Sequence, residues 1–208
     1  GCSCRGTAGV AHVSCLAEQA KILVAEAEED NLDIKVRNAR WKRWHSCGLC
    51  KQEYHGVVRC ALGWACWKSY VGRPETDMLR KAAMNQLGLG LYQTGHYEDA
   101  LPVQEAELAM ERRHGISGHN MLITQGNLAL TYKALGRLEP ALSMNRDAFL
   151  GFLKLYGEEH SETLREADNY AALLVRLERY GEAIKLLRKL APVARRVLGE
   201  GHETRLRM

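Results

Sequence analysis

Residues 126–141 read GNLALTYKALGRLEPA, and the chain repeats this pattern once before and once after. The related stretches are NQLGLGLYQTGHYEDA at 85–100 and DNYAALLVRLERYGEA at 168–183. Within each stretch apolar residues recur at every third or fourth position, which is the period of an α-helix. Gly136 interrupts the middle stretch, as the end of a helix favours. The pattern therefore predicts three helix-turn-helix units, at about 80–119, 120–160 and 161–204.

The middle stretch resembles the tetratricopeptide repeat in the form found in kinesin light chains. The family's core N-L-A-x-x-Y-x-x-x-G-x-x-x-x-A is matched by Asn127, Leu128, Ala129, Tyr132, Gly136 and Ala141. The third unit departs from the pattern, because Glu178 stands where the turn glycine is expected. The resemblance implies a mostly α-helical chain, in which the hairpins stack into an α-solenoid with a concave face.

The same resemblance implies that protein partners bind as peptides in this concave groove. Gln86, Asn127 and Asn169 occupy equivalent positions, where an amide side chain can hydrogen-bond the backbone of an extended peptide. Lys133 and Arg176 are placed to meet an acidic peptide. The alternative is that these amides only tie neighbouring helices together, and the sequence leaves both interpretations open.

The seven cysteines all lie in the first third of the chain, and several form closely spaced pairs. Cys47 and Cys50 form a C-x-x-C, Cys2 and Cys4 a C-x-C, and His12 and Cys15 an H-x-x-C. Pairs at this spacing suit zinc, because one tight turn can aim both ligands at one ion. The alternative is that the cysteines pack as small hydrophobic residues. The pairs predict zinc as a cofactor.

The order of these pairs resembles the RING-CH zinc finger, in which two zinc ions are bound in a cross-brace. The resemblance implies that Cys2, Cys4, Cys47 and Cys50 share one zinc ion, and that His12 and Cys15 are half of a second site. The first C-x-x-C of the family is missing and is expected upstream of Gly1. The gap of 31 residues from Cys15 to Cys47 is also long for the family.

RING-type fingers recruit a ubiquitin-conjugating enzyme, so the resemblance implies a ubiquitin ligase or a ligase component. Trp44 and Lys51 are then the expected contacts with the conjugating enzyme. The alternatives are that Trp44 packs against the finger and that Lys51 is an ordinary surface lysine. Enzymatic activity therefore stays open, and the competing hypothesis is a non-enzymatic scaffold in which both parts bind protein partners.

Composition sets the remaining expectations. Residues 1–73 are expected to form the finger remnant and an apolar, buried helix over 57–71, and Gly72–Pro74 is the expected boundary to the repeats at 75–208.

No apolar run reaches the roughly 18 residues of a membrane span, so we expect no membrane contact and a cytoplasmic location. The net charge of +4 is too small to favour nucleic acid. The basic, Trp-bearing stretch 35–44 could be a nucleic-acid patch with aromatic rings for stacking, and a solvated helix face explains it as well.

Overall fold

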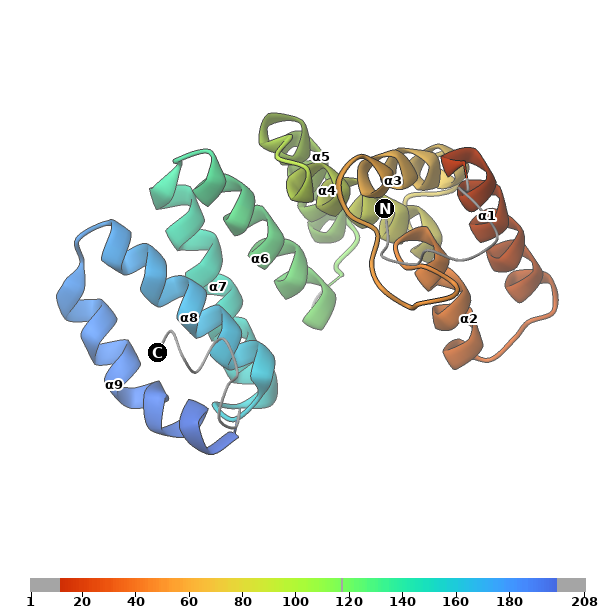
Figure 1. The fold of residues 1–208 in the computed structure, drawn as a ribbon. Coiled ribbons are helices and arrows are strands. Elements are labelled where there is room, and N and C mark those ends of the chain that lie inside the picture. Colours follow the sequence, from red (N-terminus) through yellow and green to blue (C-terminus); the bar gives the residue numbers. More distant parts are fainter. Residues whose placement is uncertain (1–11, 117, 198–208) are drawn as a thin grey trace. The chain divides into compact units, whose positions relative to one another are not determined.

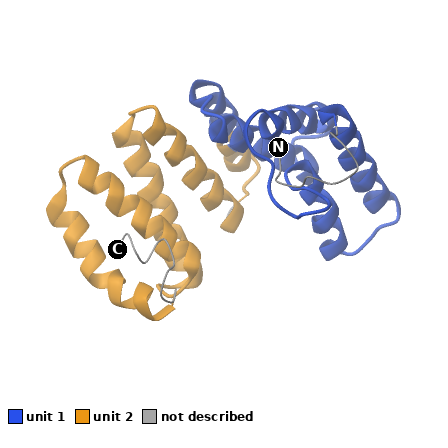
Figure 2. Cartoon of the chain, viewed as in Figure 1, with its two compact units in different colours: residues 1–107 blue, residues 108–208 orange. Residues whose placement is uncertain are grey.

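The computed structural model describes residues 12–116 and 118–197. These residues form nine α-helices and one short 3-10 helix (Figure 1). In chain order the elements are α1 (Val13–Glu29), α2 (Ile34–Trp41), η1 (Lys42–Trp44), α3 (Gly56–Tyr70), α4 (Met78–Gln93), α5 (Tyr97–Arg113), α6 (His119–Ala134), α7 (Leu138–Tyr156), α8 (Ser161–Arg176) and α9 (Tyr180–Val197). The chain divides into two compact units, residues 1–107 and 108–208, and the division falls inside α5 (Figure 2).

The first unit is built around the side chain of Trp44, which is fully buried. The ring lies against those of Trp41 and Tyr70, with centroids 6.5 and 6.0 Å away. Ala20 and Val24 of α1 complete this core from another helix. Residues 13–70 are mainly helical. A zinc-finger remnant is not shown among the described residues.

Helices α3 and α4 pack very closely, because glycine lies at both points where they cross. A Cβ atom at Gly63 would lie 3.0 Å from the carbonyl oxygen of Gln86. A Cβ atom at Gly90 would lie 3.1 Å from the carbonyl oxygen of Arg59. Any larger residue at either position has to push one helix backbone away from the other.

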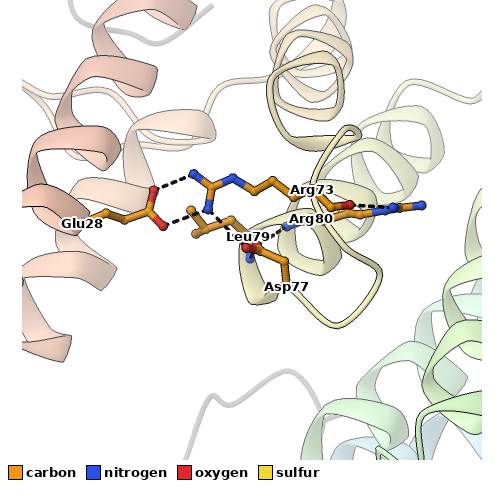
Figure 3. Close-up of polar contacts among 5 residues, drawn as sticks. All are labelled: Glu28, Arg73, Asp77, Leu79 and Arg80. Carbon is orange, nitrogen blue, oxygen red and sulfur yellow. Dashed lines mark hydrogen bonds and ion pairs between the residues drawn. The ribbon is translucent and has the colours of Figure 1, made fainter.

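The turn between α3 and α4 is fixed by Arg73 (Figure 3). The Arg73 guanidinium donates to both carboxylate oxygens of Glu28 on α1, at 2.7 and 2.8 Å, and to Asp77 at 3.2 Å. Asp77 in turn caps α4 by accepting from the backbone N–H groups of Leu79 and Arg80. The segment expected to be a boundary between domains therefore lies inside the first of the two compact units.

Helices α6 to α9 of the second unit form two hairpins, as the repeat pattern predicts. Gly136 ends α6 with a φ of 73°, in the left-handed region that favours glycine. Glu178 follows α8 at the equivalent place and takes the same conformation, with a φ of 59°. The small residues Ala141 and Ala183 are buried together in the core cluster between the hairpins.

The helix over residues 57–71, which we expected to be buried, is buried on only one of its faces. Cys66 and Leu62 of α3 are fully buried, whereas Val57 and Trp64 are 83% and 43% exposed. The expectation of a buried helix was wrong for this second face. None of the helices in the two described ranges is long and apolar enough to cross a membrane.

Candidate functional site

The candidate peptide-binding face of the second unit lies on α6 and α8. Asn127 of α6 and Asn169 of α8 are both half-buried, and Arg176 is exposed. The spacing of seven residues places Asn169 and Arg176 on the same face of α8. Lys133, near the end of α6, is half-buried. The structure therefore leaves these four of the expected groove residues at least partly open to solvent.

The carboxylate of Glu166 on α8 lies close to α6 and is hydrogen-bonded to α7. Its two oxygens accept hydrogen bonds from Asn145 of α7 at 2.8 Å and from Arg165 at 3.1 Å. Asn169 also donates to Glu166, over a longer distance of 3.4 Å. Gly126 of α6 leaves the space that this carboxylate occupies, since a Cβ atom there would lie 3.2 Å from it. The hydrogen bond from Asn169 lies within α8, whereas that from Asn145 joins α7 to α8.

Burial raises the pKa of Glu166 above its ordinary value, because the charged form loses contact with water. The nearby Arg165 acts in the opposite direction and does not cancel the effect of burial. This network was not predicted. The only sign of this network in the sequence is a glutamate on the buried face of α8. Its partner, Asn145, lies on another helix, so the pairing is visible only in the folded chain.

Gln86 differs from the two asparagines at equivalent positions. Its side chain is buried, and its Oε1 atom has no hydrogen-bond partner among the described residues. The backbone of Gln86 and Leu87 also lies against Gly63 of α3. Gln86 is therefore not presented to a peptide in this structure.

The C-x-x-C lies in a tight turn between η1 and α3. The N–H of Leu49 donates to Cys47 Sγ at 3.4 Å, and Cys47 and Gln52 are joined by a backbone hydrogen bond of 2.8 Å. Lys51 closes the turn with a φ of 63°, and its Nζ donates to the carbonyl of Gly48 at 2.6 Å. The turn places Cys47 and Cys50 within one chain reversal, which suits a pair of zinc ligands.

The other expected zinc ligands are not gathered around this turn in the described part of the chain. Cys2 and Cys4 lie outside the described residues, and Cys15 is exposed near the start of α1. His12 precedes the first turn of α1. Across the described ranges, no group of three or more His, Cys, Asp or Glu side chains could hold a metal ion.

The two residues expected to contact a conjugating enzyme differ in accessibility. Lys51 is exposed. Trp44 is fully buried in the core of the first unit, so its side chain cannot reach a partner in this structure. The basic stretch beside it is partly engaged, because Arg40 donates to the carbonyl of Leu23 and to Glu26.

The first unit also has a cleft of about 570 Å³ that the sequence did not indicate. Its walls come from α3 and from the turn that follows α4, with Val57, Cys60 and Trp64 on one side and Gln93, Thr94 and His96 on the other. The signal in the sequence is the row Val57, Ala61 and Trp64, which has helical spacing on the exposed face of α3.

Comparison with known families identifies the repeats. The profile of the tetratricopeptide repeat matches residues 122–162 and 165–204. The chain carries tetratricopeptide repeats in its second half. The first match spans α6 and α7, and the second begins within α8, so both agree with the hairpins of the structure.

Solved structures extend the likeness to the first unit. Nearly identical TPR-like repeats of the kinesin light chain class from Podosopora anserina superpose with a TM-score of 0.61 at 19% identity, covering 95% of this chain and 83% of that one. BtubC (BKLC) from P. vanneervenii gives a TM-score of 0.64 at 16% identity, covering 92% and 77%. At these identities the likeness shows the fold alone. The expected resemblance to kinesin light chain repeats is confirmed, and none of these matches is a RING-CH finger.

Two curated relatives match a shorter part of the chain. They are clustered mitochondria protein homologs from Ajellomyces capsulatus and Aspergillus niger, each 28% identical over 102 residues. The match covers 49% of this chain and 8% of each relative. The chain therefore spans a small fraction of the length of these proteins.

Proposed function

We propose that the protein is a scaffold or adaptor that binds an extended, acidic peptide of a partner protein across α6 and α8. The tetratricopeptide repeats support a role in protein interaction. The observation that carries the proposal is that Asn169 and Arg176 share one face of α8, which approaches α6 next to Asn127, where Glu166 lies against Gly126. Amides that donate and accept suit a peptide backbone, and an exposed arginine suits a carboxylate.

Arg176 sets the expected preference for acidic peptides. It is exposed and forms no ion pair with the described residues, whereas the neighbouring Arg165 already pairs with Glu162 and Glu166. Lys133 lies in the last turn of α6, as Arg176 does in α8, and adds positive charge. A carboxylate that meets Arg176 would form a charge-assisted hydrogen bond, which is stronger than a neutral one.

The proposal can be tested by selecting peptides from a random library and measuring their affinity by fluorescence anisotropy. We expect acidic sequences to be enriched, and Arg176→Glu to weaken their binding by at least about tenfold. Asn127→Ala and Asn169→Ala should each weaken binding, by about fivefold to tenfold. Lys154→Glu is the matched control, because Lys154 is an exposed cation on α7. If the selected peptides bound the wild-type protein and all four variants with the same affinity, this groove would be excluded as their binding site.

We also propose, as a second function, that the N-terminal part binds structural zinc through Cys2, Cys4, Cys47 and Cys50, with His12 and Cys15 in an incomplete second site. The turn that holds Cys47 and Cys50 supports this proposal. Packing of Val13 and Leu16 from α1 against the same cluster also supports it, because this brings the start of α1 to the turn. Zinc there would stabilise the fold, since four protein ligands leave no open position for catalysis.

A metal count tests the zinc proposal directly. Freshly purified, reduced protein should contain about one zinc ion per chain, as one complete set of four ligands requires. Cys47→Ser or Cys50→Ser should remove it. Cys66→Ser is the matched control, because Cys66 is fully buried in a different cluster. Zinc-free protein, or equal zinc in Cys47→Ser, would contradict the proposal.

A role as a ubiquitin ligase component depends on that zinc site and is the finer form of the second proposal. Lys51, rather than the buried Trp44, would then contact the conjugating enzyme. Incubation with activating enzyme, a panel of conjugating enzymes and ubiquitin should give ubiquitin chains that Lys51→Glu reduces. Absence of chains across the panel would leave the scaffold function alone. We also propose a cytoplasmic location, where cysteines stay reduced and can bind zinc.

A further inference from the structure

The C-x-x-C turn of the first unit brings two cysteines together. The N–H of Lys51 donates to the carbonyl oxygen of Cys47 at 3.1 Å, which closes a turn over residues 47–51. In a turn of this kind, α-carbons three residues apart lie about 5 Å from each other, and a disulfide spans about 4.4–6.8 Å. Cys47 and Cys50 also pack in one hydrophobic cluster. The turn therefore holds the two cysteines at a spacing that suits a disulfide.

The two cysteines differ in their access to solvent and in their hydrogen bonding. Cys50 is half-buried, whereas Cys47 is only 7% exposed. The N–H of Leu49 donates to Cys47 Sγ at 3.4 Å, which favours negative charge on this sulfur atom. A dissolved disulfide therefore reaches Cys50 first, and Cys47 is placed to attack second or to leave as the thiolate. This is the division of roles between an attacking and a resolving cysteine.

Two cations lie against the residue that follows Cys47. A Cβ atom at Gly48 would lie 2.9 Å from a guanidinium nitrogen of Arg43. The Nζ atom of Lys51 donates to the carbonyl oxygen of Gly48 at 2.6 Å. The sequence over residues 34–52 contains no aspartate or glutamate. Positive charge beside a cysteine stabilises the thiolate, which is the attacking and leaving species in disulfide exchange.

We propose that Cys47 and Cys50 form a thiol–disulfide exchange site for small disulfides of the glutathione class. The Cys50 thiolate attacks one sulfur of glutathione disulfide, and the S–S bond breaks to release one glutathione thiolate. The Cys47 thiolate then attacks the Cys50 sulfur and expels the second glutathione. Two electrons pass from the protein to glutathione disulfide, and the two thiol protons end on the two glutathione molecules. The reaction needs only these two cysteines, so it does not rest on the zinc proposal.

Mass spectrometry can follow this reaction, because trypsin cuts after Arg43 and Lys51. The resulting peptide, residues 44–51, contains Cys47 and Cys50 and no other cysteine. The full chain is reduced, stripped of metal with a chelator, checked by circular dichroism and incubated with equal concentrations of reduced and oxidised glutathione. We expect most of this peptide to lose two hydrogen atoms, as a disulfide requires. The exposed Cys15, on a separate tryptic peptide, should be oxidised to a smaller extent, because no second cysteine resolves its mixed disulfide.

Single cysteine variants test the order of the two steps. Cys47→Ser should stop the reaction at the mixed disulfide, so that residues 44–51 carry one glutathione on Cys50. Cys50→Ser should react more slowly with glutathione disulfide, because only the buried Cys47 is left.

Charge variants test the role of the two cations. Arg43→Gln combined with Lys51→Gln should slow oxidation of the wild-type cysteine pair by about threefold or more. Lys35→Gln combined with Arg37→Gln is the matched control, because it removes the same charge from exposed positions of α2. Equal rates for the two double variants would remove the charge argument.

Two results would overturn the exchange site. One is a 44–51 peptide that is no more oxidised than Cys15, and the other is Cys47→Ser protein without glutathione on Cys50. The same incubation after addition of zinc separates this proposal from the zinc proposal. Slower oxidation with release of zinc supports both proposals, whereas unchanged oxidation contradicts the zinc site alone. Zinc-loaded protein that forms no disulfide at any glutathione ratio would contradict the exchange site and leave a structural metal site.

Discussion

The side chain of Glu166 contributes to the packing of the repeats, although burial destabilises its charged form. Its carboxylate fills the space above Gly126 and accepts from Asn145, so it joins three helices of the second unit. Burial nevertheless disfavours the charged form, and the pKa of Glu166 is raised. The folded state therefore binds a proton at this site more tightly than the unfolded state does.

The pH dependence of stability should reveal this proton. Because the pKa is raised in the folded state, the contribution of Glu166 is most favourable when the carboxyl is protonated, and it is lost as pH rises through the folded-state pKa. Glu166→Gln cannot ionise. The stability of this variant relative to wild type, measured by urea unfolding, should therefore increase as pH rises from acidic to neutral values.

Glu182→Gln serves as a control of opposite sign. Hydrogen bonding to Arg179 lowers the pKa of the exposed Glu182, so its favourable contribution is present at neutral pH and is lost as pH falls. The stability of Glu182→Gln relative to wild type should therefore decrease slightly as pH rises. A Glu166→Gln variant that follows this same trend would contradict the buried-carboxylate interpretation.

The thiol of Cys66 is expected to be inert in the native protein. It is fully buried in the core with Trp44, and burial raises the pKa of the thiol far above neutral pH. Alkylation requires the thiolate. Iodoacetamide labelling followed by peptide mass spectrometry should modify the exposed Cys15 quickly, and Cys66 only after unfolding. Equal labelling of the two cysteines in native buffer would contradict this packing.

At the scale of helices, the periodicity predicted the hairpins well and the packing of α3 poorly. The boundaries of α6 to α9 follow from the helical period and the turn at Gly136, which are local features. The exposed row of Val57 and Trp64 was not predicted, because large apolar residues occur on both the buried and the exposed face of this segment. Burial of Trp44 depends on Tyr70, which lies 26 residues later and is brought close only by folding.

The crossing of α3 and α4 gives a prediction at this scale. Gly63→Ala places a methyl group about 3 Å from the backbone of Gln86, where no side chain can move aside. We expect the variant to lose about 1–3 kcal/mol of unfolding free energy by overpacking. Gly72→Ala is the matched control, because a Cβ atom there would meet nothing within 4 Å. Chemical denaturation of both variants checks the prediction, and equal midpoints would contradict it.

At the scale of the molecule, some contacts join parts of the chain that are far apart in sequence. Sequence patterns placed a boundary at Gly72–Pro74, because proline ends a helix there. They could not show that Arg73 pairs with Glu28, 45 residues earlier, since nothing local specifies that contact. The sequence indicated candidate groove residues on α6 and α8, but it did not reveal that the side chain of Gln86 is buried.

The ion pair of Arg73 with Glu28 should be measurable as a coupling energy. Both side chains are partly exposed, so we expect a double-mutant cycle of Arg73→Ala and Glu28→Gln to give about 0.5–1 kcal/mol. Arg73→Lys should retain only part of this energy, because lysine cannot donate to both oxygens in a fork. The coupling should also shrink in 1 M salt, where charges are screened. Zero coupling at low salt would show that the contact has no energetic role.

The left-handed conformation of Glu178 offers a position at which the protein can be stabilised. A residue with a side chain in this conformation costs about 1 kcal/mol, and the first two hairpins avoid that cost with Gly95 and Gly136. Replacing Glu178 by glycine should therefore raise the melting temperature, while the same change at the helical position Leu155 should lower it. The third hairpin thus retains a reserve of stability that one codon change would release.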